Sequence, residues 1–130
     1  MGSLFLRVAV VYVVAGVIFG FAIGITEKLA FANVHAHANL IGWATLALSG
    51  LIYTVFPRAG ATPLARWHFW LQNVGLPVFL LGLFLIDAGI SMPGIPIISV
   101  GSILVIAAML VFLVNVFQNV RPENAFNAQR

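Results

Sequence analysis

The chain contains 130 residues, of which 62% are hydrophobic and only 7% are charged. Soluble domains of this size carry roughly a quarter charged residues, so a water-soluble globular fold is excluded. The net charge of +3 is spread along the chain without a basic cluster, which argues against a nucleic-acid partner. The absence of cysteine excludes disulfides, thiolate metal sites, iron–sulfur clusters and a covalently attached c-type haem.

Four apolar segments are long enough to cross a bilayer, which requires about 20 residues. They cover residues 4–25, 29–56, 67–86 and 96–118, and the connectors between them carry the glycine, proline and charged residues that interrupt helices. The sequence therefore predicts an all-α membrane protein. We expect one domain over residues 1–130, a four-transmembrane-helix bundle without a separate soluble part.

Positively charged residues in short loops orient membrane proteins, because they remain on the cytoplasmic side. With four spans, both termini and the second connector share one side, and that side holds Arg7, Arg58, Arg66, Arg121 and Arg130. The opposite side holds Lys28, next to Glu27, and Asp87. This bias predicts that the N- and C-termini are cytoplasmic. The expected location is a bacterial or archaeal inner (cytoplasmic) membrane, with the protein as an integral multi-pass component.

A cleavable signal peptide is the competing interpretation of the first segment. The stretch Ala30-Phe31-Ala32 resembles a cleavage site, in which small residues flank a variable one. However, the apolar segment before it is longer than a typical signal core, and Arg7 is its only positive residue. Cleavage would also leave the histidines described next at a ragged terminus. A retained first span is therefore favoured.

Two histidines within the second span are the strongest candidates for chemistry. Strongly polar side chains are costly inside a bilayer and usually face protein or a cofactor. His35 and His37 are two residues apart, which places them about 200° apart around a regular α-helix. They therefore cannot chelate one ion, but each can serve a different partner, and imidazole is the usual axial ligand of haem iron. Simple hydrogen bonding between helices is the alternative role.

The neighbours of this pair are compatible with a flat cofactor. Asn39 lies one turn after His35 and can donate a hydrogen bond to a bound group. Gly42, like the alanines on either side of His37, is small enough to let a macrocycle approach the helix. Small residues also favour close helix packing, so they do not discriminate between these roles.

Polar residues in the later spans favour structural roles. His68 begins the third span beside Arg66 and two tryptophans, so we expect it to anchor the protein at the membrane interface rather than to bind a ligand. Tyr12 and Tyr53 are expected to serve in packing or at the interface. Hydrogen bonds between helices are expected of Gln72, Asn73, Asn115 and Gln118.

From Val34 to about Gly94 the chain resembles the tenth and eleventh helices of subunit I of the haem–copper oxidases, a family that includes nitric oxide reductases. In that family a His-x-His pair on the tenth helix binds two haems on opposite faces. The resemblance implies that His35 matches the high-spin haem ligand and His37 the low-spin haem ligand. The motif His37-Ala38-Asn39 is also similar to the second helix of nitric oxide reductases, which carries the other low-spin ligand. The remaining matching segments are Tyr53-Thr54-Val55-Phe56-Pro57, Trp67-His68-Phe69-Trp70-Leu71, Val74-Gly75 and Gly89-Ile90-Ser91-Met92-Pro93.

The chain departs from the family in several respects. It has four expected helices where the family has twelve, and it lacks counterparts of the copper-binding histidines, the cross-linked tyrosine and the arginine pair that binds haem propionates. No catalytic residue is identified, ligands for copper are not identifiable in the sequence, and one chain alone is not expected to act as an oxidase.

The resemblance and the residues together favour a haem-binding membrane cytochrome, built like one third of an oxidase core. Its expected cofactor is a b-type haem, and its expected role is electron transfer or oxidase-like redox chemistry. The alternative is a non-enzymatic haem- or gas-binding sensor, a haem carrier or an oxidase assembly factor. Expected partners are membrane lipid, an electron-donor protein and further copies of the chain. A trimer is preferred over a dimer because three copies supply twelve helices.

Overall fold

The computed structural model of the chain describes residues 1–125, in which helices are joined by short connectors and no strand is present. Arg130, one of the arginines used to predict orientation, lies outside the described residues. The elements are α1 (Gly2–Thr26), η1 (Leu29–Phe31), α2 (Ala32–His37), η2 (Ala38–Thr45), α3 (Leu46–Val55), α4 (Pro57–Ala61), α5 (Pro63–Asp87), α6 (Ser91–Asn119) and η3 (Pro122–Asn124).

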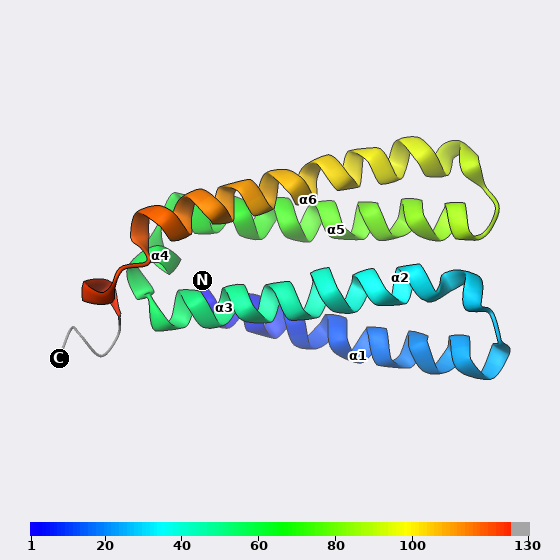
Figure 1. Cartoon of the computed structure of the whole chain (residues 1–130), viewed down its shortest axis with the longest axis horizontal. Coiled ribbons are helices and arrows are strands. Elements are labelled where there is room, and N and C mark those ends of the chain that lie inside the picture. The colour runs from blue at the N-terminus through cyan, green and yellow to red at the C-terminus, as the bar shows by residue number, and fades with distance from the viewer. Residues whose placement is uncertain (126–130) are drawn as a thin grey trace.

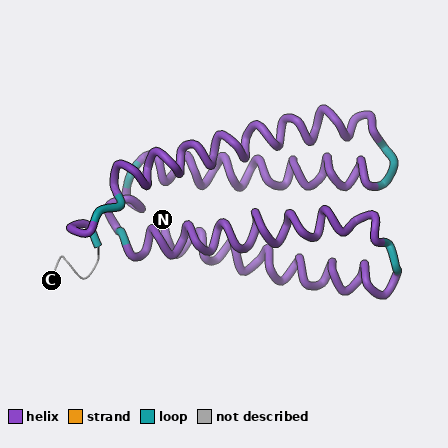
Figure 2. The backbone as a smooth tube through the Cα atoms, in the orientation of Figure 1, coloured by secondary structure: helices purple, strands orange, loops and turns teal. Residues whose placement is uncertain are grey.

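Two helical hairpins lie side by side (Figures 1 and 2). In one hairpin, α1 packs against a long second helix that α2, η2 and α3 form together, and in the other α5 packs against α6. The N terminus, α4 and η3 share one end of the molecule, called here the terminal end (Figure 1). The connectors after α1 and α5 share the other end, called the loop end.

Four helices are long and apolar enough to cross a membrane: Gly2–Thr26, Leu29–Val55, Pro63–Asp87 and Ser91–Asn119. The prediction of an all-helical chain with four long apolar helices is therefore confirmed. Many of the large apolar side chains on α1 and α6 are more than half exposed, including Ile18, Phe21, Ile103 and Phe117. Such surface is costly in water, which is consistent with an integral membrane protein.

The start of α5 differs from the sequence prediction. This helix begins at Pro63 rather than at Trp67, and the preceding connector forms the short helix α4. The Thr62 hydroxyl accepts a hydrogen bond from the Ala65 backbone N–H at 3.1 Å, and proline fits the first helical position because its missing N–H would have no partner there. Thr62 and Pro63 thus determine where α5 begins, whereas the apolar stretch used for the prediction begins four residues later.

The second helix is not regular. Directly after His37, residues Ala38–Thr45 adopt π-helical bonding before α-helical geometry resumes at Leu46. The Asn39 side chain donates to the His35 carbonyl at 2.9 Å, and the Thr45 hydroxyl donates to the Leu40 carbonyl five residues back, also at 2.9 Å. Short π-helical segments often occur at functional sites, so this one draws attention to the histidines beside it.

An aromatic core joins the two hairpins at the terminal end. The Phe5 ring lies 5.2 Å from the Tyr53 ring and 5.1 Å from the Phe69 ring, both edge to face. Toward the loop end the hairpins also pack against each other, for example through the stack of Phe31 on Phe84 at 4.8 Å. The terminal-end core consists of Phe5, Ala9, Leu46, Tyr53, Ala59, Ala65 and Phe69.

Glycines let the backbones of α5 and α6 approach closely. A Cβ atom added to Gly101 would collide with the backbone of Phe79, and one added to Gly82 would collide with the backbone of Ile98. Because backbone atoms cannot rotate away as a side chain can, these positions tolerate no larger residue without a shift of the helices.

We expect Gly101→Ala to lower the free energy of unfolding by about 1–3 kcal/mol, since it forces α5 and α6 apart. The matched control is Gly24→Ala in α1, where an added Cβ would meet nothing within 4 Å. That control is expected to be neutral or stabilising, because alanine favours helix more than glycine. Unfolding of both variants in mixed detergent micelles, followed by circular dichroism, measures the difference. Equal stability of the two variants would contradict the packing described.

Candidate functional site

The His35 imidazole is held against α1 by its Nδ1 atom, which lies 2.9 Å from the Gly16 carbonyl oxygen. A carbonyl oxygen only accepts hydrogen bonds, so Nδ1 must carry the proton and donate it. The neutral ring then has its lone pair on Nε2. Metal-binding histidines usually show this arrangement, in which one ring nitrogen donates to a carbonyl and the other faces the metal.

Two glycines of α1 make room for this side chain. A Cβ atom on Gly20 would lie 2.5 Å from Cε1 of His35, and one on Gly16 would lie 2.6 Å from the amide of Asn39. The sequence reasoning missed both glycines. Their spacing of four residues, a pattern that favours close helix–helix approach in membranes, was the available signal.

Asn39 is engaged within its own hairpin. Its amide nitrogen donates to the His35 carbonyl at 2.9 Å. The same nitrogen lies 3.3 Å from Nδ1 of His35, but that contact joins two donors, because the Nδ1 proton already points to the Gly16 carbonyl. A hydrogen bond from Asn39 to a cofactor stays a prediction.

His37 shows the same arrangement on another side of the helix. Its Nδ1 lies 2.8 Å from the Asn33 carbonyl oxygen, which again assigns the proton to Nδ1 and the lone pair to Nε2. Its ring centre lies 5.2 Å from that of Phe79 in α5. The two imidazoles therefore contact different helices, in agreement with the separation expected from their spacing.

An apolar groove of about 250 Å³ lies beside His37 and is formed by the second helix, α5 and α6. Besides the histidine its one polar lining residue is Ser102, whose hydroxyl donates to the Ile98 carbonyl at 2.7 Å. The side of the groove formed by α6 includes the exposed Ile106, which is 59% accessible. The lining consists of His37, Ile41, Phe79, Ser102, Val105 and Ile106.

The donor set suits one kind of metal group. Within residues 1–125 no three histidine, cysteine or acidic side chains come together as a metal cage. The histidines instead offer single imidazole donors. A bare ion needs several protein ligands, whereas haem brings its own four nitrogen ligands and takes one or two axial imidazoles. The chemistry of these residues therefore fits a haem better than an isolated ion, although the groove is too small to enclose the whole ring.

Gly42 and Gly50 are buried against α1 of the same chain. A Cβ atom on Gly42 would lie 2.5 Å from the Tyr12 ring, and one on Gly50 would lie 3.0 Å from the Gly2 carbonyl oxygen. The clearance that Gly42 provides is used for packing on Tyr12, and its predicted contact with a cofactor stays a prediction.

The prediction that His68 anchors the protein at the membrane interface is wrong. His68 is completely buried, its Nδ1 lies 2.9 Å from the Tyr53 hydroxyl, and its ring stacks on Phe112 at 4.7 Å. The neighbouring indoles of Trp67 and Trp70 are the exposed groups. His68 faces the core together with Phe69 and Gln72, which follow it by one and four residues on α5. This helical spacing of inward-facing residues is the sequence signal that could have predicted the burial of His68.

Asn115 connects this buried pair to the rest of the terminal end. Its amide nitrogen donates to the Tyr53 hydroxyl at 3.3 Å and to the Ala59 carbonyl at 3.1 Å. Its amide oxygen accepts from the Thr62 hydroxyl at 3.1 Å and from the Asn119 amide at 2.9 Å. One buried amide thus links α3, α4, α6 and the cap of α5, and the predicted interhelical role of Asn115 is confirmed.

The other three predicted interhelical groups behave differently from one another. The Gln72 amide donates to the Ile41 carbonyl across the hairpins at 3.3 Å, as expected. The Asn73 amide donates to the Phe69 carbonyl of its own helix at 2.8 Å. Gln118 is exposed and makes no hydrogen bond within residues 1–125. The expectation therefore fails for Asn73 and Gln118, whose positions on their helices do not face a neighbouring hairpin.

No family model, no curated protein and no solved structure matches this chain. The likeness to the haem–copper oxidases accordingly rests on the short motifs alone.

We expect Tyr53→Phe to lower the free energy of unfolding by about 1–3 kcal/mol, because it leaves Nδ1 of the buried His68 without its partner. Tyr12→Phe is the matched control, since the Tyr12 hydroxyl makes no hydrogen bond within residues 1–125 and its ring would keep its packing. Unfolding in mixed micelles compares the two variants. A loss of stability as large in Tyr12→Phe as in Tyr53→Phe would refute the special role of the buried pair.

Proposed function

We propose that this chain is a haem-binding membrane cytochrome that transfers electrons, with His37 as an axial ligand of a b-type haem. The observation that carries the proposal is that both imidazoles have the same tautomer, with the proton on Nδ1. In each ring the Nδ1–H group donates to a backbone carbonyl, which leaves the Nε2 lone pair for a metal. The same bonds would satisfy a membrane histidine without a ligand, so the tautomer supports ligation and the spectra described below test it.

The surroundings of His37 favour electron transfer over reduction of a substrate. Chemistry on oxygen or nitric oxide consumes protons and needs acid–base groups near the reacting atoms. The groove beside His37 is lined by apolar residues and one serine, and that serine already donates to a backbone carbonyl. An apolar wall keeps water from the haem edge and supplies no proton donor. Bound haem would contribute the change of oxidation state, while His37 would hold the iron and orient the ring.

His35 serves a separate partner in this proposal. Its ring contacts α1, whereas the ring of His37 contacts α5, so one haem cannot use both nitrogens from the same side of the helix. Resemblance to the oxidase family supports a second haem at His35. The close packing of His35 on Gly20 makes His37 the better candidate for the first site.

The groove volume supports an assembly of several chains. Pockets that enclose a small-molecule ligand measure roughly 300–1,000 Å³, and the groove at His37 holds only about 250 Å³. A haem at His37 would extend past the groove toward the exposed surface of α6. A second copy of the chain can supply the missing wall and the sixth ligand through closed symmetry. We favour a trimer, whose twelve helices match the number in the oxidase subunit, and place a dimer second.

The proposed orientation puts the terminal end in the cytoplasm. Arg7, Arg58, Arg66 and Arg121 belong to this end, whereas the loop end has Lys28 beside Glu27. Positive residues favour the cytoplasmic side of a bacterial or archaeal inner membrane. His37 would then lie in the outer half of the bilayer, where an electron-donor protein outside the cytoplasm can reach it.

A haem- or gas-binding sensor is the second candidate function. One observation favours it: within residues 1–125, no second imidazole lines the groove opposite His37. A haem held by His37 alone would be five-coordinate and would keep an open position for a diatomic gas. A reduced spectrum that shifts with carbon monoxide would support this function, whereas two split bands in the reduced state would support the bis-histidine cytochrome.

We expect His37→Gly to abolish the low-spin haem spectrum of the purified protein and added imidazole to restore it. The small ligand can occupy the space of the missing side chain and supply the same Nε2 lone pair. Visible absorption spectroscopy of the reduced protein, with haem quantified per chain, gives the readout. Restoration by imidazole separates the loss of a ligand from a failure to fold.

His35→Ala is the matched comparison within the same motif. We expect it to leave the haem at His37 largely intact, because the two rings contact different helices. An unchanged spectrum in His37→Gly would remove the assignment of this residue. Loss of all haem in each single variant, with folding preserved, would argue for one shared site on a distorted helix.

The assembly is tested by measuring the mass of the gently solubilised, haem-loaded protein. We expect a trimer, with a dimer as the second choice, since each groove needs a wall from a neighbour, and the haem is counted per chain in the same sample. The carbon monoxide response of the same sample reports whether a sixth ligand is present. A monomer that keeps a bis-histidine haem would contradict the assembly proposal, because it would reveal a second ligand inside one chain.

A further inference from the structure

A second groove, of about 360 Å³, lies on the first two turns of α5 at the terminal end. It is lined by Pro63, Arg66, Trp67 and Trp70. The last three follow Pro63 by three, four and seven residues, which aligns all four along one face of the helix. This face is the outward one, because the neighbouring His68, Phe69 and Gln72 point into the core.

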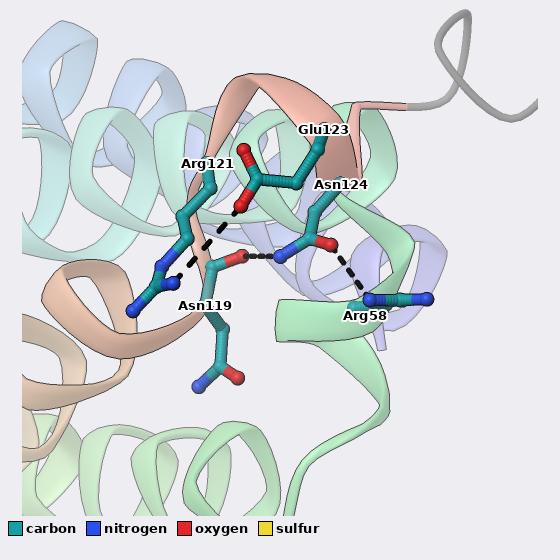
Figure 3. Close-up of polar contacts among 5 residues, drawn as sticks. All are labelled: Arg58, Asn119, Arg121, Glu123 and Asn124. Atoms are coloured by element: carbon teal, nitrogen blue, oxygen red, sulfur yellow. Dashed lines mark hydrogen bonds and ion pairs between the residues drawn. The ribbon is translucent and has the colours of Figure 1, made fainter.

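The arginines of the terminal end differ in how they are engaged. Figure 3 shows Arg121 at 4.0 Å from the Glu123 carboxylate and Arg58 donating to the Asn124 amide oxygen at 2.9 Å. The side chains of Arg7 and Arg66 make no hydrogen bond or ion pair within residues 1–125, and of these two Arg66 lines the groove. A guanidinium presents several donors in a plane and matches the oxygens of a phosphate two at a time. Arg66 is therefore left with the capacity to bind an anion from outside the chain.

The two indoles make this groove suitable for a lipid rather than for a dissolved anion. Trp67 and Trp70 are each 63% exposed, so their apolar rings form open walls beside the guanidinium. Indoles prefer the level of the lipid headgroups, where the ring meets glycerol and acyl carbons and the N–H meets polar oxygens. A free phosphate ion would gain nothing from such walls.

We infer that Arg66, Trp67 and Trp70 form a binding site for an anionic phospholipid, with the lipid phosphate on Arg66 and the glycerol backbone between the indoles. Charge complementarity supports this occupant, because the terminal end carries more arginine than acidic side chains in the described chain. The inference requires insertion of the protein in a bilayer but does not depend on haem binding. The contact with lipid that the sequence suggested for His68 is thereby assigned to the outward face of α5.

Fluorescence quenching by brominated lipids tests the site. Trp43→Phe leaves Trp67 and Trp70 as the remaining indoles of the chain. The full-length protein is placed in vesicles of phosphatidylcholine with a minor fraction of phosphatidylglycerol, and one lipid at a time is brominated. We expect phosphatidylglycerol to quench about fivefold more per molecule than phosphatidylcholine, as one arginine at the headgroup level predicts. Both values come from one protein preparation, so any quenching by haem cancels in their ratio.

Arg66→Gln should bring this ratio to about one, because it removes the charge and keeps most of the side-chain length. Arg7→Gln is the matched control at the same end and should leave the ratio unchanged. Equal quenching by the two lipids, or an equal loss in the Arg7 variant, would overturn the site. Excess inorganic phosphate at constant ionic strength is expected to have no effect. Loss of the ratio under phosphate would show a free-anion site and would also overturn the lipid assignment.

Discussion

The fold depends on the requirement that polar groups inside apolar helices find partners within the protein. At the terminal end one connected cluster meets part of this requirement, because Asn115 joins the Tyr53–His68 pair to α4 and to the cap of α5. Four helical elements are thereby fixed relative to one another, and the aromatic core packs around them. Within residues 1–125, Nε2 of His68 and Oε1 of Gln72 are buried without a hydrogen-bond partner. The loop end has no comparable cluster among the described residues, so its two hairpins meet mainly through aromatic contacts such as Phe31 on Phe84.

The same requirement prepares the candidate haem ligands. His35 and His37 satisfy their Nδ1 protons with backbone carbonyls, one from the facing helix and one from the preceding turn. Neither arrangement uses another side chain, so both Nε2 atoms keep their lone pairs without an acidic partner nearby. The π-helical segment that begins directly after His37 turns the following residues around the axis. Of the two rings, His35 is packed against α1, and His37 lies beside the groove formed with α5 and α6.

The sequence predicted the features that length and composition control. Four helices followed from four apolar stretches, and the different directions of His35 and His37 followed from their spacing. The neighbours of each side chain were harder to predict, because a helix that is apolar all around does not indicate which face meets which partner. His68 was misplaced because Arg66, Trp67 and Trp70 surround it in sequence, although they occupy another face. The slot that Gly16 and Gly20 form for His35 depends on the pairing of α1 with the second helix, which periodicity does not encode.

The two candidate sites lie on different halves of α5. Phe79 beside His37 and Arg66 in the lipid groove are separated by thirteen residues, or about 20 Å along the helix. The lipid groove lies at the same end as the polar cluster, and its charged group is Arg66. The haem groove lies farther along α5 and opens toward apolar surface on α6. A neighbouring chain can cover that surface without displacing the lipid, so lipid binding at one end and assembly around haem at the other are structurally compatible.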